Sequence, residues 1–207
     1  MKNKKNEETK TKHDTSLHII QTAHQLFMEK GFAGVSTRLI ASECGITQPA
    51  LYHHFPNKVS IYLAVLQTDL GKTEEAIHAI VASQGSVRDA LLEVTIYILL
   101  NRPKNLGQIN SDMKQHMDLE QQLTIRHHWT SAYLTPIEQL LKGTLINERL
   151  IEEDSTHLAK LAHVYLGMVH QQLPEMDRLA KVEESDARKR AEFLVNVYLD
   201  GIMNNGD

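Results

Sequence analysis

Apolar residues recur every three to four positions along most of the chain, which is the period of an amphipathic helix. Between residues 15 and 30 the apolar face carries Ile19, Ala23, Leu26 and Phe27, and Gly31 follows as a C-terminal stop. No stretch alternates apolar and polar residues as a strand does, and no internal repeat is found. The pattern predicts an all-α chain of about nine helices: 15–30, 37–44, 48–54, 57–83, 86–101, 106–117, 119–147 with a bend at Pro136, 154–172 and 185–203.

Residues 1–14 differ from the rest because they contain no apolar residue after Met1. Such a segment cannot bury a hydrophobic face, so it is predicted to be a disordered basic tail. Its five lysines either contact phosphates or, in the plainer interpretation, only keep the tail soluble.

The window Thr37–Lys58 reads TRLIASECGITQPALYHHFPNK and holds two short predicted helices. The first runs from Thr37 to about Cys44, a turn containing Gly45 follows, and the second runs from Gln48 to about His54. Two short helices joined by a tight glycine turn form a helix-turn-helix, whose second helix is sized for the major groove of DNA. The window therefore indicates a transcription regulator rather than an enzyme.

The residue types in this window suit DNA. Ser36 is a good N-cap, and the helix N-terminus behind it attracts a phosphate. An outward Arg38 is suited to a guanine edge or a phosphate, and Gln48 to adenine. The other candidates are small apolar surfaces for a thymine methyl and side chains that reach phosphates or base edges: Pro49, Ala50, Tyr52, His53, His54 and Lys58. Each residue alone is equally well explained as solvated surface, so the prediction rests on the whole arrangement.

These motifs resemble the tetracycline-repressor (TetR) family of bacterial regulators. The resemblance covers about residues 16–65 and is carried by paired positions: Gly31-Phe32, Ser36-Thr37, Ile40-Ala41, Gly45-Ile46, Leu51-Tyr52, His54-Phe55, and then Lys58. It implies that Thr37, Tyr52 and Lys58 hold phosphates. It also implies that bases are faced by Arg38, Gln48, Pro49 and His53.

The last two predicted helices carry a second prediction. The run AEFLVNVYLDGIM, residues 191–203, is apolar nearly all round, so it must be covered on two sides. Either both helices fill the core of a monomer, or one side meets a partner. The family resemblance favours pairing into a four-helix bundle, with Gly167 and Gly201 allowing close approach. The predicted homodimer interface comprises Leu158, Leu161, Tyr165, Leu194, Tyr198 and Ile202.

The resemblance also implies a pocket for a small-molecule inducer within the helical body. The candidate lining residues are Leu66, Leu70, Tyr97, Met113, Met117, Trp129, Tyr133 and Met168. Methionines and aromatics suit an adaptable apolar pocket, but they suit an ordinary core equally well. Trp129, the only tryptophan, is the preferred candidate, together with its neighbours His127 and His128.

Charge and cysteine content agree with a cytoplasmic protein that touches DNA at one end. Residues 1–60 contain eight Lys or Arg and five Asp or Glu, whereas residues 61–207 contain fourteen and twenty-one. The single cysteine, Cys44, excludes an internal disulfide and is interpreted as a small half-buried residue rather than a redox sensor. No apolar run is long enough for a membrane span, and no secretion signal is seen.

Metal and enzyme motifs are missing from the sequence. The twelve histidines are scattered, with no His-Glu-x-x-His and no cysteine pair, so no metal and no cofactor is expected. No nucleophile elbow, Walker loop or dinucleotide fingerprint is present, which excludes the commonest enzyme classes.

Together these observations predict three parts: the tail 1–14, a helix-turn-helix DNA-binding domain 15–60, and a ligand-binding and dimerisation domain 61–207. The predicted function is a homodimeric repressor that binds near-palindromic double-stranded DNA and is released by a small molecule. Two alternatives stay open: an activator of the same kind, and an all-helical module that binds another protein.

Overall fold

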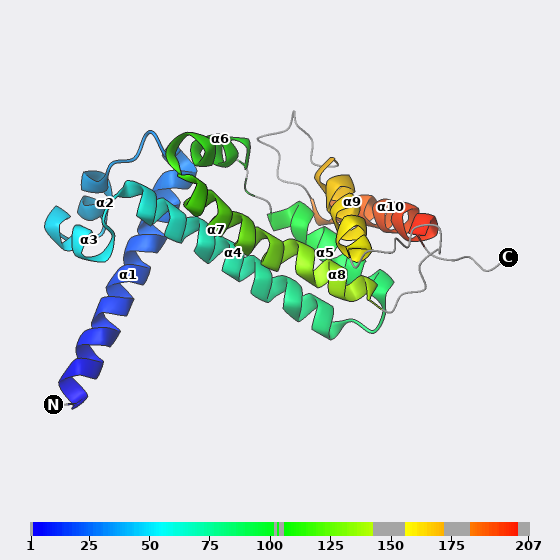
Figure 1. The fold of residues 1–207 in the computed structure, drawn as a ribbon, viewed down its shortest axis with the longest axis horizontal. Helices are drawn as coiled ribbons and strands as arrows, with labels where there is room; N and C mark the ends of the chain where they lie inside the picture. Colours follow the sequence, from blue (N-terminus) through cyan, green and yellow to red (C-terminus); the bar gives the residue numbers. More distant parts are fainter. Residues whose placement is uncertain (1, 102, 104–105, 143–155, 172–182, 203–207) are drawn as a thin grey trace. The chain divides into compact units, whose positions relative to one another are not determined.

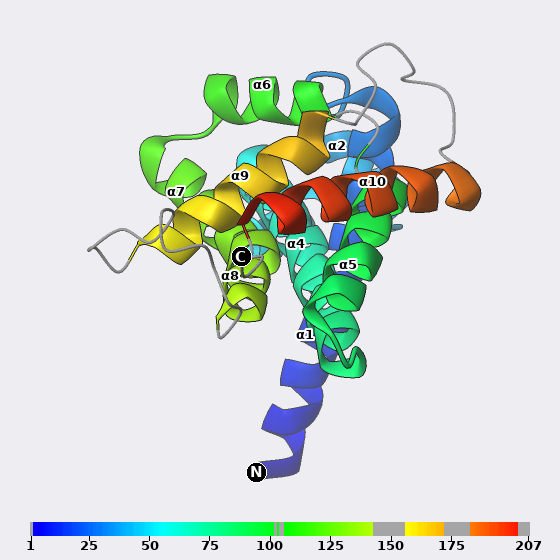
Figure 2. The ribbon, with the colours of Figure 1, turned by 90° about the vertical axis from the view of Figure 1, so that its right-hand side faces the viewer.

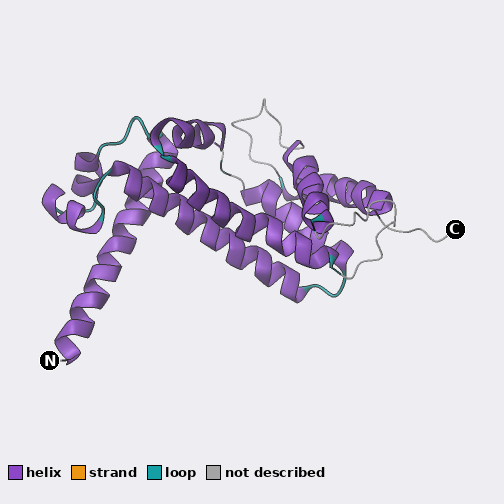
Figure 3. Cartoon of the chain, in the orientation of Figure 1, coloured by secondary structure: helices purple, strands orange, loops and turns teal. Residues whose placement is uncertain are grey.

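Every regular element of the described residues is a helix (Figure 3). The structure is a computed structural model that describes residues 2–101, 103, 106–142, 156–171 and 183–202, with side chains from residue 14 onward. These residues form nine helices when the stretch from α7 through η1 to α8 is counted as one. The all-α prediction is confirmed.

The N-terminal helices are those that the sequence predicts, except for one boundary. They are α1 (Lys2–Lys30), α2 (Thr37–Glu43) and α3 (Gln48–His54) (Figure 1). The prediction of a disordered tail is wrong for residues 2–14, because α1 begins at Lys2. That prediction rested only on the lack of apolar residues, which determines whether a segment can be buried. Lysine and glutamate nevertheless have high helix propensity, and no glycine or proline interrupts residues 2–30.

The middle of the chain begins with α4 (Lys58–Ser83), α5 (Val87–Asn101) and α6 (Leu106–His116). Asn57 and Ser60 cap α4 reciprocally: the Ser60 N–H donates to Asn57 Oδ1 at 2.8 Å, and the Asn57 N–H donates to Ser60 Oγ at 3.2 Å. Ser86 caps α5 by accepting from the Asp89 N–H at 3.1 Å. Gly71 lies inside α4, which continues without interruption through it.

The long helix predicted over 119–147 is divided by a π-helical turn. It consists of α7 (Leu119–Trp129), η1 (Thr130–Leu134) and α8 (Thr135–Leu141). The bend predicted at Pro136 is therefore an irregular turn that precedes the proline: the Thr135 N–H bonds the Thr130 carbonyl, five residues back. Pro136 has no N–H to continue the α-helical ladder, which accounts for the irregularity on its N-terminal side. Residues 143–147 lie outside the described residues.

The last two helices are α9 (His157–Gln171) and α10 (Glu184–Ile202). The outermost predicted positions, 154, 172 and 203, lie outside the described residues. Among the helices that the structure describes, none combines the length and the apolar content needed to cross a bilayer.

The chain divides into two compact units. The first contains residues 1–69 and 105–125, and the second contains residues 70–104 and 126–207. Thus α6 and the first part of α7 belong with the helix-turn-helix, although they follow it by about fifty positions along the sequence. The division at residue 60 into functional domains remains a prediction.

The core of the first unit is built on three aromatic rings. The ring of Tyr62 in α4 lies 4.9 Å from that of Phe27 in α1, measured between centroids. It lies 5.0 Å from the ring of Phe32, in the connection to α2. All three side chains are buried. They fix α1, the connection and α4 to one another.

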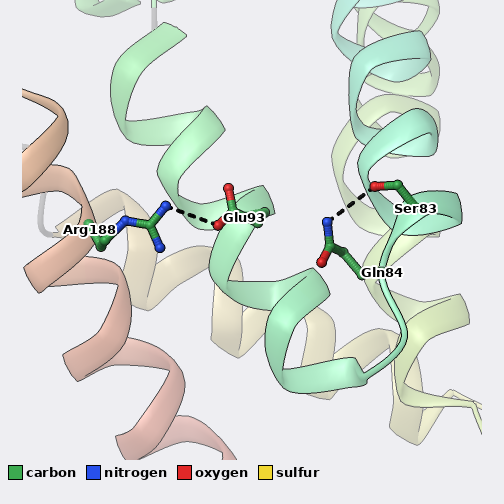
Figure 4. Close-up of polar contacts among 4 residues, drawn as sticks. All are labelled: Ser83, Gln84, Glu93 and Arg188. Carbon is green, nitrogen blue, oxygen red and sulfur yellow. Dashed lines mark hydrogen bonds and ion pairs between the residues drawn. The ribbon is translucent and has the colours of Figure 1, made fainter.

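The core of the second unit is built where α10 and α9 meet α5 and α8 (Figure 2). Tyr165 and Tyr198 are buried there, and each hydroxyl donates to a backbone carbonyl, Leu91 O and Leu161 O respectively, at 3.0 Å. These bonds satisfy polar groups that would be costly if left unpaired. At the surface, Arg188 of α10 pairs with Glu93 of α5 at 3.2 Å, and Gln84 donates to Ser83 at 3.2 Å after α4 (Figure 4).

Candidate nucleic-acid interface

Both short helices of the helix-turn-helix begin at N-cap residues that the sequence supplies. Ser36 Oγ accepts from the Leu39 N–H at 3.1 Å and begins α2, and Thr47 Oγ1 accepts from the Ala50 N–H at 3.3 Å and begins α3. Between them Gly45 has φ +65°, a left-handed conformation that an L-residue adopts at a cost. The turn therefore needs its glycine.

A small apolar core holds the two helices. Ile40, Ala41 and Leu51 are buried. Cys44 is buried beside them, and burial raises the pKa of its thiol. A buried thiol with a raised pKa is unreactive, which supports a packing role.

A cluster of three polar side chains joins the start of α2 to α3. The Gln48 amide nitrogen donates to Thr37 Oγ1 and to the Tyr52 hydroxyl, each at 3.1 Å, and the Thr37 and Tyr52 hydroxyls are themselves 3.1 Å apart. The hydrogen bonds from Thr37 and then Gln48 lower the pKa of the Tyr52 phenol. We call these three residues the Thr37–Gln48–Tyr52 cluster. The structure therefore brings together three residues that the sequence proposes separately.

The other candidates of the window differ in their surroundings. Arg38, Pro49 and His53 are exposed, as is the capping residue Ser36, and Ala50 is half-buried. His54 is turned back to α1, where its Nδ1 lies 2.8 Å from Ser16 Oγ. His54 thus has a structural partner that the sequence did not suggest.

Lys58 is also engaged within the protein. Its ammonium donates to the carbonyls of Phe32 and Val35 at 2.9 Å and 3.0 Å and lies 4.0 Å from the centre of the Phe32 ring. Burial lowers the pKa of Lys58, and the negative charge of Asp112 opposes this effect. The structure thus places Lys58 on the α1–α2 connection, whereas the sequence suggested a phosphate contact. Helix periodicity carries no signal for such a bond.

The pocket candidates are divided between the two units. Leu66, Met113 and Met117 belong to the first unit, where Leu66 and Met117 are buried, and Leu70, Tyr97, Trp129, Tyr133 and Met168 belong to the second. In the second unit the Trp129 ring is 5.7 Å from Tyr133, 6.4 Å from His163 and 6.5 Å from His170. Burial raises the pKa of Tyr133 and lowers that of His170. His163 and His170 therefore lie near Trp129, although the sequence had suggested only His127 and His128 as its neighbours.

The predicted dimer residues lie largely inside the chain, and their role in pairing remains a prediction. Tyr165, Leu194, Tyr198 and Ile202 are buried within a single chain, and Leu158 and Leu161 pack partly buried against the same core. The opposite sides of α9 and α10 instead expose Val164, Phe193 and Val197, at 56%, 63% and 48% of their surface. The exposed face could have been found from the sequence only by knowing which side of α10 meets α5.

The fold and this geometry define a helix-turn-helix protein. Residues 19–65 match the profile described as bacterial regulatory proteins, tetR family. Over these residues, the helix-turn-helix segment of the chain is similar to the tetR family of bacterial regulatory proteins.

Three similar proteins illustrate the extent of the likeness. The uncharacterized HTH-type transcriptional regulator YuxN of Bacillus subtilis is 39% identical over 97 residues, 47% of this chain and 33% of YuxN. The HTH-type transcriptional repressor NemR of Escherichia coli is 26% identical over 83 residues, 40% of this chain and 42% of NemR. Thus the chain matches well under half the length of these curated relatives. The crystal structure of the regulator FadR from Bacillus subtilis with stearoyl-CoA has a TM-score of 0.67 and 16% identity, covering 90% of this chain and 98% of FadR, and shows a shared fold.

Proposed function

We propose that this protein is a sequence-specific DNA-binding transcriptional repressor that acts in the cytoplasm. The observation that carries the proposal is the capped α2–α3 pair, which exposes Arg38, Pro49 and His53 beside the Thr37–Gln48–Tyr52 cluster. A helix of this kind reads base edges in the major groove, while hydroxyls and cations contact phosphates. The name of NemR supports repression. Activation by the same DNA contacts is the alternative.

The repressor acts as a homodimer in this proposal. One helix-turn-helix makes few base contacts, and a two-fold dimer doubles them on a near-palindrome. The exposed apolar residues Val164, Phe193 and Val197 on α9 and α10 support pairing through these helices. Large apolar side chains exposed together on neighbouring helices mark an interaction surface.

A small molecule releases the DNA in this proposal. The aromatic and half-buried surroundings of Trp129 are the candidate contact in the second unit, and acyl-CoA thioesters are the first ligand class to test because FadR was crystallised with stearoyl-CoA. A ligand releases DNA only if it prefers a conformation that does not fit the operator. A hundredfold loss of affinity requires a preference of about 2.7 kcal/mol, within the usual range of allosteric coupling.

The test begins with duplexes selected from a random-sequence pool by the purified protein. We expect enrichment of a near-palindrome whose half-site centres lie about 34–36 Å apart or at a multiple of that spacing. Footprinting should show protection of both half-sites. Enrichment of no sequence would favour the alternative of a protein-binding module, and protection of one asymmetric half-site by a monomer would exclude the dimer.

A further inference from the structure

Asp112 on α6 is the buried carboxylate of the described residues, with 3% of its surface exposed. The side-chain amide of Gln108, one turn earlier on the same helix, donates to Asp112 Oδ1 at 2.7 Å. A buried charge is costly unless other groups compensate it. A positive group close to Asp112, from outside α6, would reduce this cost further.

The candidate partner is Lys58, at the start of α4 in the same compact unit. The Asp112 charge favours the charged form of Lys58, as seen in its effect on the pKa of the ammonium. Tyr62, one turn after Lys58, also feels this charge: burial first, and then Asp112, raise the pKa of its phenol. Asp112 also lies one helical turn before His116 on α6, so the two side chains share one face of that helix.

A second contact joins α6 to the same region. The ring of His116 lies 4.6 Å from that of Phe32, between centroids, and Phe32 belongs to the connection between α1 and α2. Lys58 donates to the carbonyls of Phe32 and Val35 in this connection, and the Val35 N–H also donates to Phe32 O at 3.3 Å. Ser36, the N-cap of α2, is the next residue.

We propose that Asp112 is a positioning residue for DNA binding: it holds the Lys58 ammonium on the Phe32 and Val35 carbonyls and so fixes the start of α2 and the Thr37–Gln48–Tyr52 cluster. The proposal rests on the proposed DNA-binding function and adds a residue that lies far outside the helix-turn-helix in sequence. In this arrangement Lys58 acts through the backbone of the connection, and α6 is a functional part of the DNA-binding unit.

The direction in which one substitution changes the affinity for DNA distinguishes a positioning role from a purely electrostatic effect. Asp112→Asn removes a negative charge, which on electrostatic grounds alone should strengthen binding to the polyanion DNA. Positioning predicts the opposite, a loss of affinity of about tenfold, which lies within the coupling seen between residues of one network. Lys58→Met should weaken binding by a similar factor without changing the slope of log affinity against log salt. A direct phosphate contact would instead lower that slope by about one.

The experiment measures fluorescence anisotropy of full-length protein on its selected duplex at several salt concentrations. The double variant Asp112→Asn with Lys58→Met should be little weaker than either single variant, because both changes break one link. Glu120→Gln on α7 and Lys114→Met on α6, both exposed, are the matched controls and should bind like the unchanged protein.

Hydrogen–deuterium exchange of the same proteins gives a readout that needs no DNA and excludes global unfolding. Asp112→Asn should speed exchange in residues 32–40 and leave the second unit unchanged. Normal or tighter DNA binding by Asp112→Asn with unchanged exchange in that segment would overturn the inference. Failure of the unchanged protein to bind any selected duplex would instead overturn the proposed function, and the inference with it.

Discussion

Gln48 already uses the nitrogen of its side-chain amide within the protein, donating to Thr37 and to Tyr52. An amide nitrogen has two N–H groups, so both are engaged. Recognition of adenine needs one N–H and the amide oxygen together. If Gln48 reads adenine, one internal hydrogen bond is exchanged for the base, while the other keeps the amide oriented.

Gln48→Ala tests whether this residue reads a base. We expect a loss of about 1–3 kcal/mol on the best site and a relaxed preference at one base pair, as for a bidentate contact. The measurement is binding to a set of duplexes that differ at single positions. Equal losses on the best site and on random DNA would show that Gln48 only braces α2 against α3.

His170 provides a pH-dependent prediction in the second unit. Burial lowers its pKa below the ordinary value of 6.5, so the unfolded chain binds a proton more readily than the folded one. The free energy of unfolding should therefore decrease as pH falls through about 6.5, until the lowered pKa of the folded state is passed. Urea titrations followed by Trp129 fluorescence would measure this dependence.

His170→Gln should flatten that pH dependence, because the substituted side chain does not titrate in this range. His78→Gln on α4, where the histidine is exposed, is the matched control and should leave the dependence as it is. An unchanged pH dependence in His170→Gln would mean that other groups cause it.

At the scale of the elements, substitution of two glycines by alanine should change the free energy of unfolding in opposite directions, although both glycines lie in open space. Neither Gly45 nor Gly71 would bring a Cβ within 4 Å of another group. Gly45 has φ +65°, whereas Gly71 lies within the regular helix α4. Backbone conformation alone therefore decides what a methyl group does at each position.

Gly45→Ala should lower the free energy of unfolding by roughly 1–2 kcal/mol, the cost of a left-handed L-residue. Gly71→Ala should raise it by about 0.8–1 kcal/mol through helix propensity. Thermal unfolding followed by circular dichroism would measure both. A stabilised Gly45→Ala protein would show that the turn tolerates a different conformation, and a destabilised Gly71→Ala protein would show that α4 needs flexibility there.

Features of the structure that depend on local signals could be predicted from the sequence, whereas those that depend on distant residues could not. Helices α2 and α3 were predictable because their caps and Gly45 are local signals. The bend was predicted at Pro136, whereas the irregular π-helical turn lies just before it, because a missing N–H disturbs the ladder on its N-terminal side. The bonds of Lys58 and His54 and the buried side of α10 depend on residues far away in sequence, and periodicity alone does not reveal them.

At the scale of the whole molecule, the exposed side of α10 becomes the testable surface. Phe193→Asp should abolish the proposed dimer while keeping helix content, because a charge would be desolvated in an apolar interface. The sedimentation coefficient should decrease to that of a monomer, and the affinity for the operator should decrease with it. Glu192→Gln, an exposed neighbour, is the control.

Tyr198→Asp is expected to behave differently from Phe193→Asp, since Tyr198 is buried in the core of its own chain. It should lower the unfolding temperature rather than release a folded monomer. A folded monomer from Tyr198→Asp, or an intact dimer from Phe193→Asp, would assign the interface to another face.

Gly167 and Gly201 are exposed on the same two helices as Val164, Phe193 and Val197, and the space above each is open. Glycines beside larger apolar side chains would make the proposed pairing surface uneven, so that a surface of complementary shape would fit it best. Discrimination of this kind excludes wrong partners by steric clash. A cell with several regulators of the same architecture would thereby keep their subunits from mixing, and a larger side chain at either glycine would alter the choice of partner before it altered the fold.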